Sequence, residues 1–127
     1  MRVYLAASFK RKSEMRKCRD DLRKLGITVT STWLREHNAC DKTMSPAQAE
    51  LRAIIDKEDI GRADLLIEFT EKRARGGHIY ETGYADALGL DMLFVGPRVH
   101  VFHYQSQFSQ VNTWKEALAW VRSRIKS

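Results

Sequence analysis

One short stretch, Asp64-Leu65-Leu66-Ile67-Glu68-Phe69, is apolar almost without interruption. A strand at the centre of a parallel sheet is buried on both faces and has this near-continuous apolar character. A charged, glycine-ended segment follows over 70–77, and then a helical segment with small residues along one side over 78–89. The stretch therefore predicts a central parallel strand whose carboxyl end leads through a loop into a helix.

The same alternation of strand and helix continues on both sides of this stretch. Other strands are expected at 2–7, 27–31 and 92–95, with 99–102 as a short fifth strand. Helices are expected from an N-cap at Ser13 to Gly26, from the Ser45-Pro46 start to 63, and from an N-cap at Thr113 to 125. The alternation predicts one α/β domain over 1–127, a flavodoxin/Rossmann-like three-layer sandwich with a parallel sheet of four or five strands.

The composition points to an anionic partner. The 127 residues carry a net charge of +6, which suits a nucleic acid or a small phosphate ester. Cations on the first and last helices are more typical of solvated faces, whereas Lys10 to Lys12 follow a strand directly and a loop could aim them at a ligand. Basic residues are not interleaved with aromatic ones along a stripe, so nucleic acid is not the expected partner.

Several classes of protein are not expected from the sequence. The longest apolar runs are a few residues long, no signal peptide is evident, and we expect a cytoplasmic protein without a membrane partner. The histidines at 37, 78, 100 and 103 and the cysteines at 18 and 40 lack the spacing of metal ligands. GxGxxG and Walker signatures are absent. We therefore expect neither a metal nor another cofactor.

In folds of this class, ligands bind outside the carboxyl ends of the strands, where the strand order reverses. Four segments should meet there, at 8–12, 31–38, 70–78 and 96–104. The first candidate for chemistry is Glu81, in the first turns of the helix after the central strand, behind Gly76 and Gly77. The helix N-terminus should keep its carboxylate ionised, as a nucleophile or base requires. The alternative is a glutamate that only stabilises its own helix start.

Two further groups are candidates. Asp56 and Asp59 share a helix face before the central strand and could divide acid and base roles, although a solvated acidic face is the alternative. Ser8 and Lys10 follow the first strand and could bind a phosphate or a sugar hydroxyl, although a plain loop is the alternative. With no GxSxG elbow and no Cys–His arrangement indicated by spacing, carboxylate chemistry remains.

Three segments together resemble the nucleoside 2-deoxyribosyltransferases and the related deoxynucleoside 5′-monophosphate N-glycosidases. The first is 3–9 with its Tyr4 and Ser8, and the second has Asp56 eight residues before Asp64. The third is the helix segment 77–88 with Glu81, Gly83 and Ala85 in register. The resemblance covers roughly residues 1–96.

The resemblance implies roles for the matched positions. Glu81 would attack the anomeric carbon and form a glycosyl-enzyme intermediate. Asp56 would protonate the departing base or position the nucleophile, and Tyr4 would hold the nucleophile or the sugar. Water as the acceptor would make a hydrolase, and a second base a transferase. The expected substrate-binding residues are Ser8, Phe9, Lys10, Trp33, Asp59, Gly76, Gly77, His78 and His103.

The sequence also departs from the family. The monophosphate glycosidases tend to have a glycine-rich first loop, where this chain has Ser8-Phe9-Lys10-Arg11-Lys12. Because these cations could bind a phosphate instead, a nucleotide is slightly favoured over a nucleoside. Residues 99–104 lie outside the shared pattern and could form a substrate wall or reach a neighbouring subunit, and the family suggests a homodimer or higher homo-oligomer. A non-catalytic nucleotide-binding module of the same fold is the alternative function.

Overall fold

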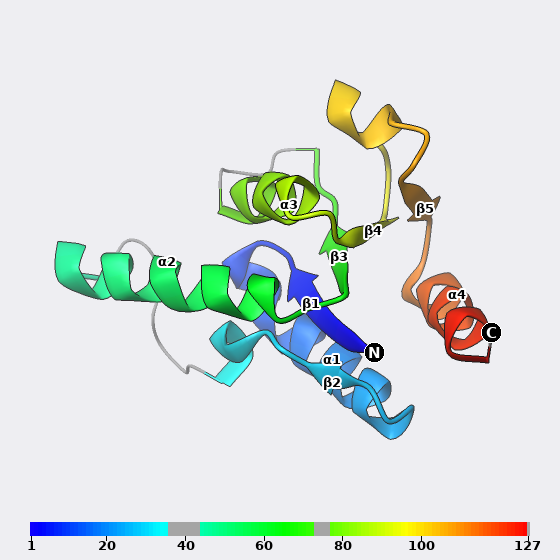
Figure 1. Ribbon diagram of the computed structural model, residues 1–127, viewed down its shortest axis with the longest axis horizontal. Coiled ribbons are helices and arrows are strands. Elements are labelled where there is room, and N and C mark those ends of the chain that lie inside the picture. The colour runs from blue at the N-terminus through cyan, green and yellow to red at the C-terminus, as the bar shows by residue number, and fades with distance from the viewer. Residues whose placement is uncertain (36–43, 73–76, 127) are drawn as a thin grey trace.

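The computed structural model describes residues 1–35, 44–72 and 77–126. Its centre is one sheet with the strand order β2-β1-β3-β4-β5, in which every neighbouring pair is parallel (Figure 1). All five residues of β3 are buried, as expected for the central strand. The strands are β1 (Arg2–Ala6), β2 (Thr28–Val29), β3 (Leu65–Phe69), β4 (Asp91–Val95) and β5 (Ser109–Val111).

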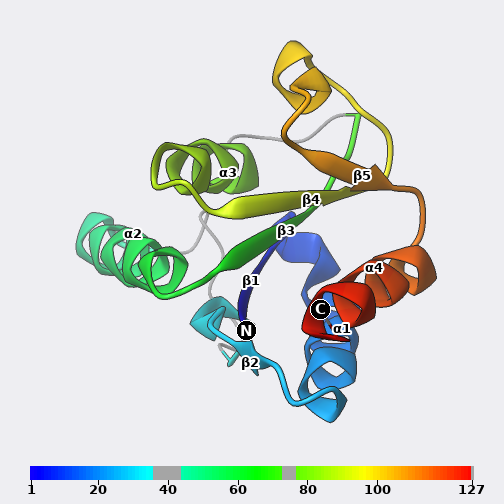
Figure 2. The same cartoon turned by 45° about the vertical axis from the view of Figure 1, so that its right-hand side comes forward.

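Helices cover both faces of this sheet. Figure 2 shows α2 and α3 on one face and α1 and α4 on the other, so the molecule has three layers. The expected fold class is confirmed. None of the helices in the described ranges has the length and apolar character needed to cross a membrane. The α-helices are α1 (Lys12–Lys24), α2 (Pro46–Gly61), α3 (Gly77–Ala87) and α4 (Trp114–Lys126), and the short 3₁₀ helices are η1 (Phe9–Arg11), η2 (Thr32–Arg35) and η3 (Val101–Tyr104).

Two of the three expected helix caps are confirmed. Ser45 and Gln48 form a capping box at the start of α2. Thr113 Oγ1 accepts the N–H of Glu116 at 3.2 Å, and the Glu116 carboxylate accepts the N–H of Thr113 at 3.0 Å. The expected cap at Ser13 is wrong, because η1 runs directly into α1 and places Ser13 inside the helix.

The expected fifth strand at 99–102 is also wrong. The strand that pairs with β4 is Ser109–Val111, while Val101–Tyr104 forms η3. A strand parallel to β4 can start only after the chain has returned to the opposite end of the sheet. Residues 99–102 follow β4 too closely for that return. Within η3, Val101 and Phe102 are both exposed, at 75% and 67%.

The strand order determines where the ligand crevice lies. After β1 the chain passes to α1 on one face, and after β3, the neighbour of β1, it passes to α3 on the other face (Figure 2). The helices therefore diverge at the carboxyl ends of β1 and β3, which is the position where ligands bind in this class of fold.

The neighbouring β4 ends in a close backbone contact. Gly96 has a φ of +117°, and a Cβ at this position would lie 2.6 Å from Thr70 Oγ1. The same hydroxyl donates to the carbonyl of Pro97 at 2.6 Å. The glycine is therefore required both by its backbone angle and by the space beside β3.

Candidate active site

A tyrosine–glutamate pair lies between β1 and α3. Tyr4 is in the middle of β1 and has no exposed surface, and its hydroxyl donates to Glu81 Oε2. Burial, with the nearby carboxylates of Glu81 and Asp56, raises the pKa of Tyr4 well above its ordinary value. The phenol therefore stays protonated and can donate to Glu81 across the neutral pH range.

The ionisation of Glu81 differs from the expectation. The sequence predicted a carboxylate at an exposed helix start, kept ionised by the helix N-terminus. In the structure Glu81 is half-buried, and burial raises its pKa to about 8. The hydrogen bond from Tyr4 and the charge of Arg52 act in the opposite direction. Desolvation is therefore the largest effect on Glu81, and a minor part of the protein holds its carboxylate ionised at neutral pH.

Asp56 projects from α2 towards this pair, close enough to raise the pKa of both Tyr4 and Glu81. Its carboxylate accepts a hydrogen bond from Arg52 Nε at 3.0 Å. Arg52 also donates to Thr32 Oγ1 at 3.0 Å, which joins α2 to η2. The three residues proposed as catalytic therefore come together from three elements that are distant in the sequence.

Asp59 does not belong to a solvated acidic face. It is buried with 1% of its surface exposed, and its Oδ2 accepts the N–H and hydroxyl of Thr32 at 3.0 and 2.6 Å. Its Oδ1 accepts a hydrogen bond from Arg62. These contacts hold η2 against α2, so Asp59 fixes the position of the helix that carries Asp56. Its substrate-binding role stays a prediction.

The loop after β1 contacts the loop after β3. Ser8 Oγ donates to Glu71 Oε1, Arg11 Nη1 lies 3.6 Å from the same oxygen, and Lys10 Nζ lies 3.8 Å from Oε2. Arg11 also forms a two-pronged contact with Glu14, at 3.0 and 2.9 Å. The cations that the sequence offered for a phosphate thus face carboxylates of the chain itself.

Two expected contact residues differ in their exposure. Phe9 is 42% exposed, and its ring has the Lys12 ammonium 4.9 Å from its centroid. Trp33 is buried, and its indole N–H donates to the carbonyl of Leu5 at 2.9 Å, at the end of β1. Phe9 can therefore reach a ligand at the rim, whereas Trp33 supports the strand that carries Tyr4.

His78 and His103, both expected at the site, contact the buried carboxylate of Glu68. His103 Nδ1 accepts the N–H of Val99 at 3.0 Å, so its Nε2 carries the proton and donates to Glu68 Oε1 at 3.1 Å. His78 Nε2 lies 3.5 Å from Glu68 Oε2. Burial raises the pKa of Glu68 to about 7 and lowers that of His103 to about 4. The cluster joins the start of α3, η3 and the residue Val99 before η3 to the end of β3.

The histidine cluster is closed to solvent in this structure. The exposed fractions of Glu68, His78 and His103 are 1%, 3% and 1%. As arranged here the two histidines support the crevice, and their contact with a substrate stays a prediction. Gly77, expected as the last residue of the loop, is instead the first residue of α3, and Gly76 lies outside the described residues. Within the described ranges no three His, Cys, Asp or Glu side chains form a group that could hold a metal ion.

Sequence reasoning missed three polar residues of this region. Arg52 could have been noticed as a cation four residues before Asp56, the spacing at which helical side chains meet. Glu71 lies two residues after β3, inside the loop expected at the crevice. Glu68 gave a weaker signal, a lone carboxylate in an apolar strand, which by itself indicates only that a buried partner must exist.

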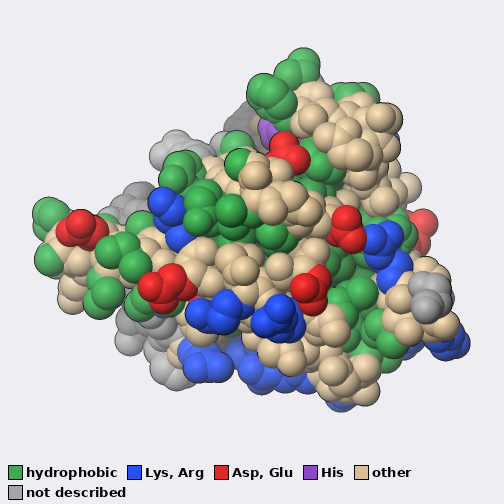
Figure 3. Space-filling model, in the orientation of Figure 1, with side chains coloured by type: hydrophobic (Ala, Val, Ile, Leu, Met, Phe, Trp, Pro, Cys, Tyr) green, Lys and Arg blue, Asp and Glu red, His purple; other side chains and the backbone are tan. Residues whose placement is uncertain are grey.

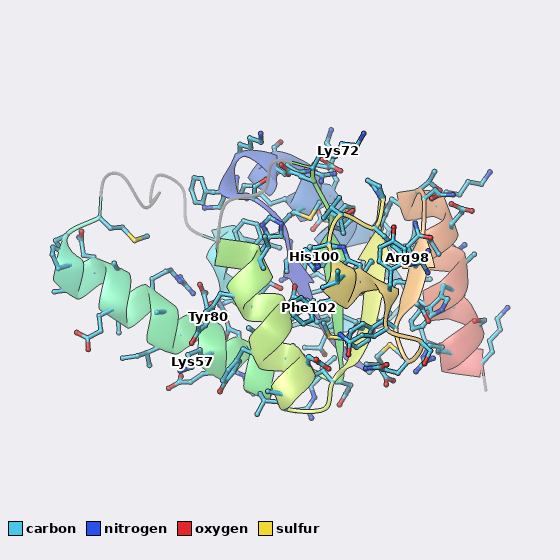
Figure 4. All side chains as sticks on the ribbon, turned by 90° about the horizontal axis from the view of Figure 1, so that it is seen from above. Lys57, Lys72, Tyr80, Arg98, His100 and Phe102 are labelled. Atoms are coloured by element: carbon cyan, nitrogen blue, oxygen red, sulfur yellow. The ribbon has the colours of Figure 1, made fainter. Side chains whose placement is uncertain are left out.

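The exposed cations of α1 and the side chains over α3 form different kinds of surface. Lys17, Arg23 and Lys24 of α1 are exposed, which favours the solvated-face interpretation of that cluster. Figure 3 shows Lys and Arg side chains on the lower part of one face and hydrophobic side chains gathered over α3. In Figure 4, Tyr80 lies on the side of α3 that faces α2, and Phe102 lies on its other side.

Comparison with known proteins supports the fold. No family model and no curated protein matches the sequence. The fold is shared with a 2-deoxyribosyltransferase of Bacillus psychrosaccharolyticus, with 21% identity, coverage of 92% of this chain and 90% of that chain, and a TM-score of 0.73. The CMP N-glycosidase BcmB of Clostridium botulinum has 22% identity, coverage of 98% of this chain and 99% of that chain, and a TM-score of 0.65. A conserved protein of Enterococcus faecalis has 16% identity, coverage of 98% of this chain and of that chain, and a TM-score of 0.71. The chain therefore has the fold of the deoxyribosyltransferases and N-glycosidases, as the resemblance implied.

Proposed function

We propose that this protein cleaves or transfers the N-glycosidic bond of a 2′-deoxynucleoside or its 5′-monophosphate, through a covalent intermediate on Glu81. The observation that carries the proposal is the hydrogen bond from the buried Tyr4 to the half-buried Glu81, at the point where the strand order reverses and close enough to Asp56 for its charge to affect both pKa values. The two solved relatives that act on an N-glycosidic bond or transfer deoxyribose share this fold, which is consistent with the proposal.

In the first step a carboxylate oxygen of Glu81 bonds to the anomeric carbon as the bond from that carbon to the base nitrogen breaks. The electron pair leaves with the base, which takes a proton from Asp56, so this step uses the form of the protein in which Asp56 is protonated and Glu81 is ionised. The transition state resembles an oxocarbenium ion, and the surrounding carboxylates stabilise its positive charge. The Tyr4 hydroxyl holds the attacking carboxylate in one orientation and favours its ionised form.

In the second step an acceptor attacks the anomeric carbon, the ester to Glu81 breaks, and the carboxylate is restored. Asp56, now ionised, accepts the proton of the acceptor. Water gives the free sugar and makes the protein a hydrolase, whereas a second nucleobase makes it a transferase. Two displacements on one carbon retain the configuration of the sugar.

The proposal is tested by chromatographic detection of free base from each common deoxynucleoside and deoxynucleoside monophosphate, with and without a second base. Glu81→Gln should lose at least about a thousandfold in turnover, because nucleophile and intermediate are both removed. Asp86→Asn is the matched control, since Asp86 is an exposed carboxylate on the same helix, and it should retain the wild-type rate. Wild-type turnover in Glu81→Gln would remove the nucleophile from the proposal.

The intermediate and the role of Asp56 have separate tests. Acid quenching during turnover, followed by mass spectrometry of peptides, should find the deoxyribosyl adduct on the peptide that contains Glu81. Asp56→Asn should slow base release about a hundredfold or more, and least for bases that leave without protonation. Substrate binding without release of any base by the wild-type protein would instead favour the non-catalytic binding module.

A further inference from the structure

The carboxylate of Glu71, in the loop after β3, is bound by the loop after β1. Both carboxylate oxygens of Glu71 are engaged by the loop after β1: Oε1 by the Ser8 hydroxyl and by Arg11 at 3.6 Å, and Oε2 by Lys10 at 3.8 Å. These contacts hold the loop after β1 beside the loop after β3. The Glu71 side chain is only 19% exposed.

These donors are the kind that recognise a phosphate. A hydroxyl, a guanidinium and an ammonium in the loop after the first strand would supply charge-assisted hydrogen bonds to phosphate oxygens. Here Glu71 already accepts a hydrogen bond from Ser8 and forms ion pairs with Arg11 and Lys10. Burial acts to raise the pKa of Glu71, but the Ser8 hydrogen bond and the charges of Lys10 and Arg11 prevail and hold that pKa below its ordinary value. The carboxylate is therefore ionised at neutral pH.

The proposed reaction orients the sugar between two ends of the crevice. The base departs towards Asp56 on α2, since that carboxyl group supplies its proton. The 5′ carbon lies across the furanose ring from the anomeric carbon, so it points away from α2. The loops after β1 and β3, joined by the Ser8–Glu71 hydrogen bond, lie at the carboxyl ends of these two strands, and we place the 5′ carbon there.

Resting on the function proposed above, we propose that Glu71 selects nucleosides over their 5′-monophosphates. The Glu71 carboxylate accepts a hydrogen bond from the 5′-hydroxyl of a nucleoside. A 5′-phosphate dianion in the same place meets an ionised carboxylate of like charge and would have to displace it from Ser8, Lys10 and Arg11. This inference reverses the preference for a nucleotide that the basic loop suggested.

The test compares kcat/KM for base release from one deoxynucleoside and from its 5′-monophosphate. The wild-type protein should prefer the nucleoside by about tenfold or more. Glu71→Gln keeps the size of the side chain and removes its charge, so the ratio should shift towards the monophosphate by about tenfold or more. The ratio within each variant cancels any general loss of activity.

Glu14→Gln is the matched control. Glu14 contacts the same Arg11 guanidinium at 2.9 Å, from α1, and the side chain is 50% exposed. This variant also removes one negative charge beside Arg11, so it controls for a change of net charge. Its ratio should stay within about twofold of the wild-type ratio, because an exposed charge is screened by solvent and salt.

Two results would overturn the inference while base release continued. One is a wild-type preference for the monophosphate, which would mean that phosphate displaces Glu71, and the other is an unchanged ratio in Glu71→Gln. Calorimetric binding of the same two compounds to the Glu81→Gln protein, with and without Glu71→Gln, measures the selection without turnover. Absence of base release from the wild-type protein would refute the proposed function, and the binding ratio would still decide the role of Glu71.

Discussion

Replacing Tyr4 by Phe removes one hydroxyl and keeps the buried ring. In the structure that hydroxyl donates to Glu81 Oε2 and acts to lower the pKa of Glu81, which burial holds at about 8. The phenylalanine variant should therefore have a Glu81 with a still higher pKa. If the ionised carboxylate is the nucleophile, less of it is present at neutral pH and the reaction slows.

The size of the effect follows from the strength of the lost bond. A hydrogen bond to a charged group contributes about 1.5–3 kcal/mol. One pKa unit corresponds to about 1.4 kcal/mol, so the pKa of Glu81 should rise by about one to two units. At pH 7 the ionised fraction then falls from roughly a tenth to between roughly a hundredth and a thousandth. The rate of base release at pH 7 should drop by about ten- to a hundredfold.

The assay is a pH profile of kcat/KM, which reports the ionisation of the free enzyme. For wild type the rate should rise with pH through an apparent pKa near 8, and for Tyr4→Phe this limb should move up by about one to two units. The two rates should converge near pH 10. Tyr80→Phe is the matched control, since Tyr80 is 62% exposed on the same helix as Glu81, and its profile should match the wild type.

Either of two outcomes would refute this reasoning. An equal loss at every pH would mean that Tyr4 binds the sugar and does not act through the ionisation of Glu81. A wild-type profile in Tyr4→Phe would mean that the pair is not used in the reaction. Circular dichroism across the same pH range would show that the variant remains folded.

Three further predictions concern stability. Folding raises the pKa of Glu81 from 4.5 to about 8, so the wild-type protein loses stability as the pH rises through that range. Glu81→Gln should therefore be more stable than wild type by on the order of 2–4 kcal/mol at pH 8.5, and should differ little near pH 4.5. Thermal unfolding at several pH values measures this difference. Gly96→Ala should lower the free energy of unfolding, measured in urea, by about 1–3 kcal/mol. Gly61→Ala is the control because its Cβ would meet open space, and it should change that free energy by less than about 1 kcal/mol. Equal effects of the two variants would contradict the packing argument. Glu68→Ala should lower the free energy of unfolding by about 1–3 kcal/mol, because it leaves the buried Nε2–H of His103 without its acceptor, and an unchanged urea midpoint would show that this bond contributes nothing.

The sequence by itself determined the kind of fold and most of its elements. Apolar periodicity and capping chemistry are local, so they indicated β3, the capping boxes at Ser45 and Thr113, and Glu81 in the first turns of α3. The strand expected at 99–102 was wrong because a local sequence pattern does not reveal whether a segment has room to run parallel to its neighbour. Ser109–Val111 has that room because η3 and the following turn bring the chain back beside Leu93, in the middle of β4.

The tertiary structure alone decided the partners and the ionisation states. Tyr4 meets Glu81 across 77 positions of sequence and Ser8 meets Glu71 across 63, and both pairs exist because β1 and β3 are neighbours in the sheet. A side chain's pKa depends on the water it loses when distant elements close around it, which no local pattern records. For that reason the sequence could name Glu81 as a candidate nucleophile, while only the packed crevice showed that burial raises its pKa and that Glu71 holds the basic loop.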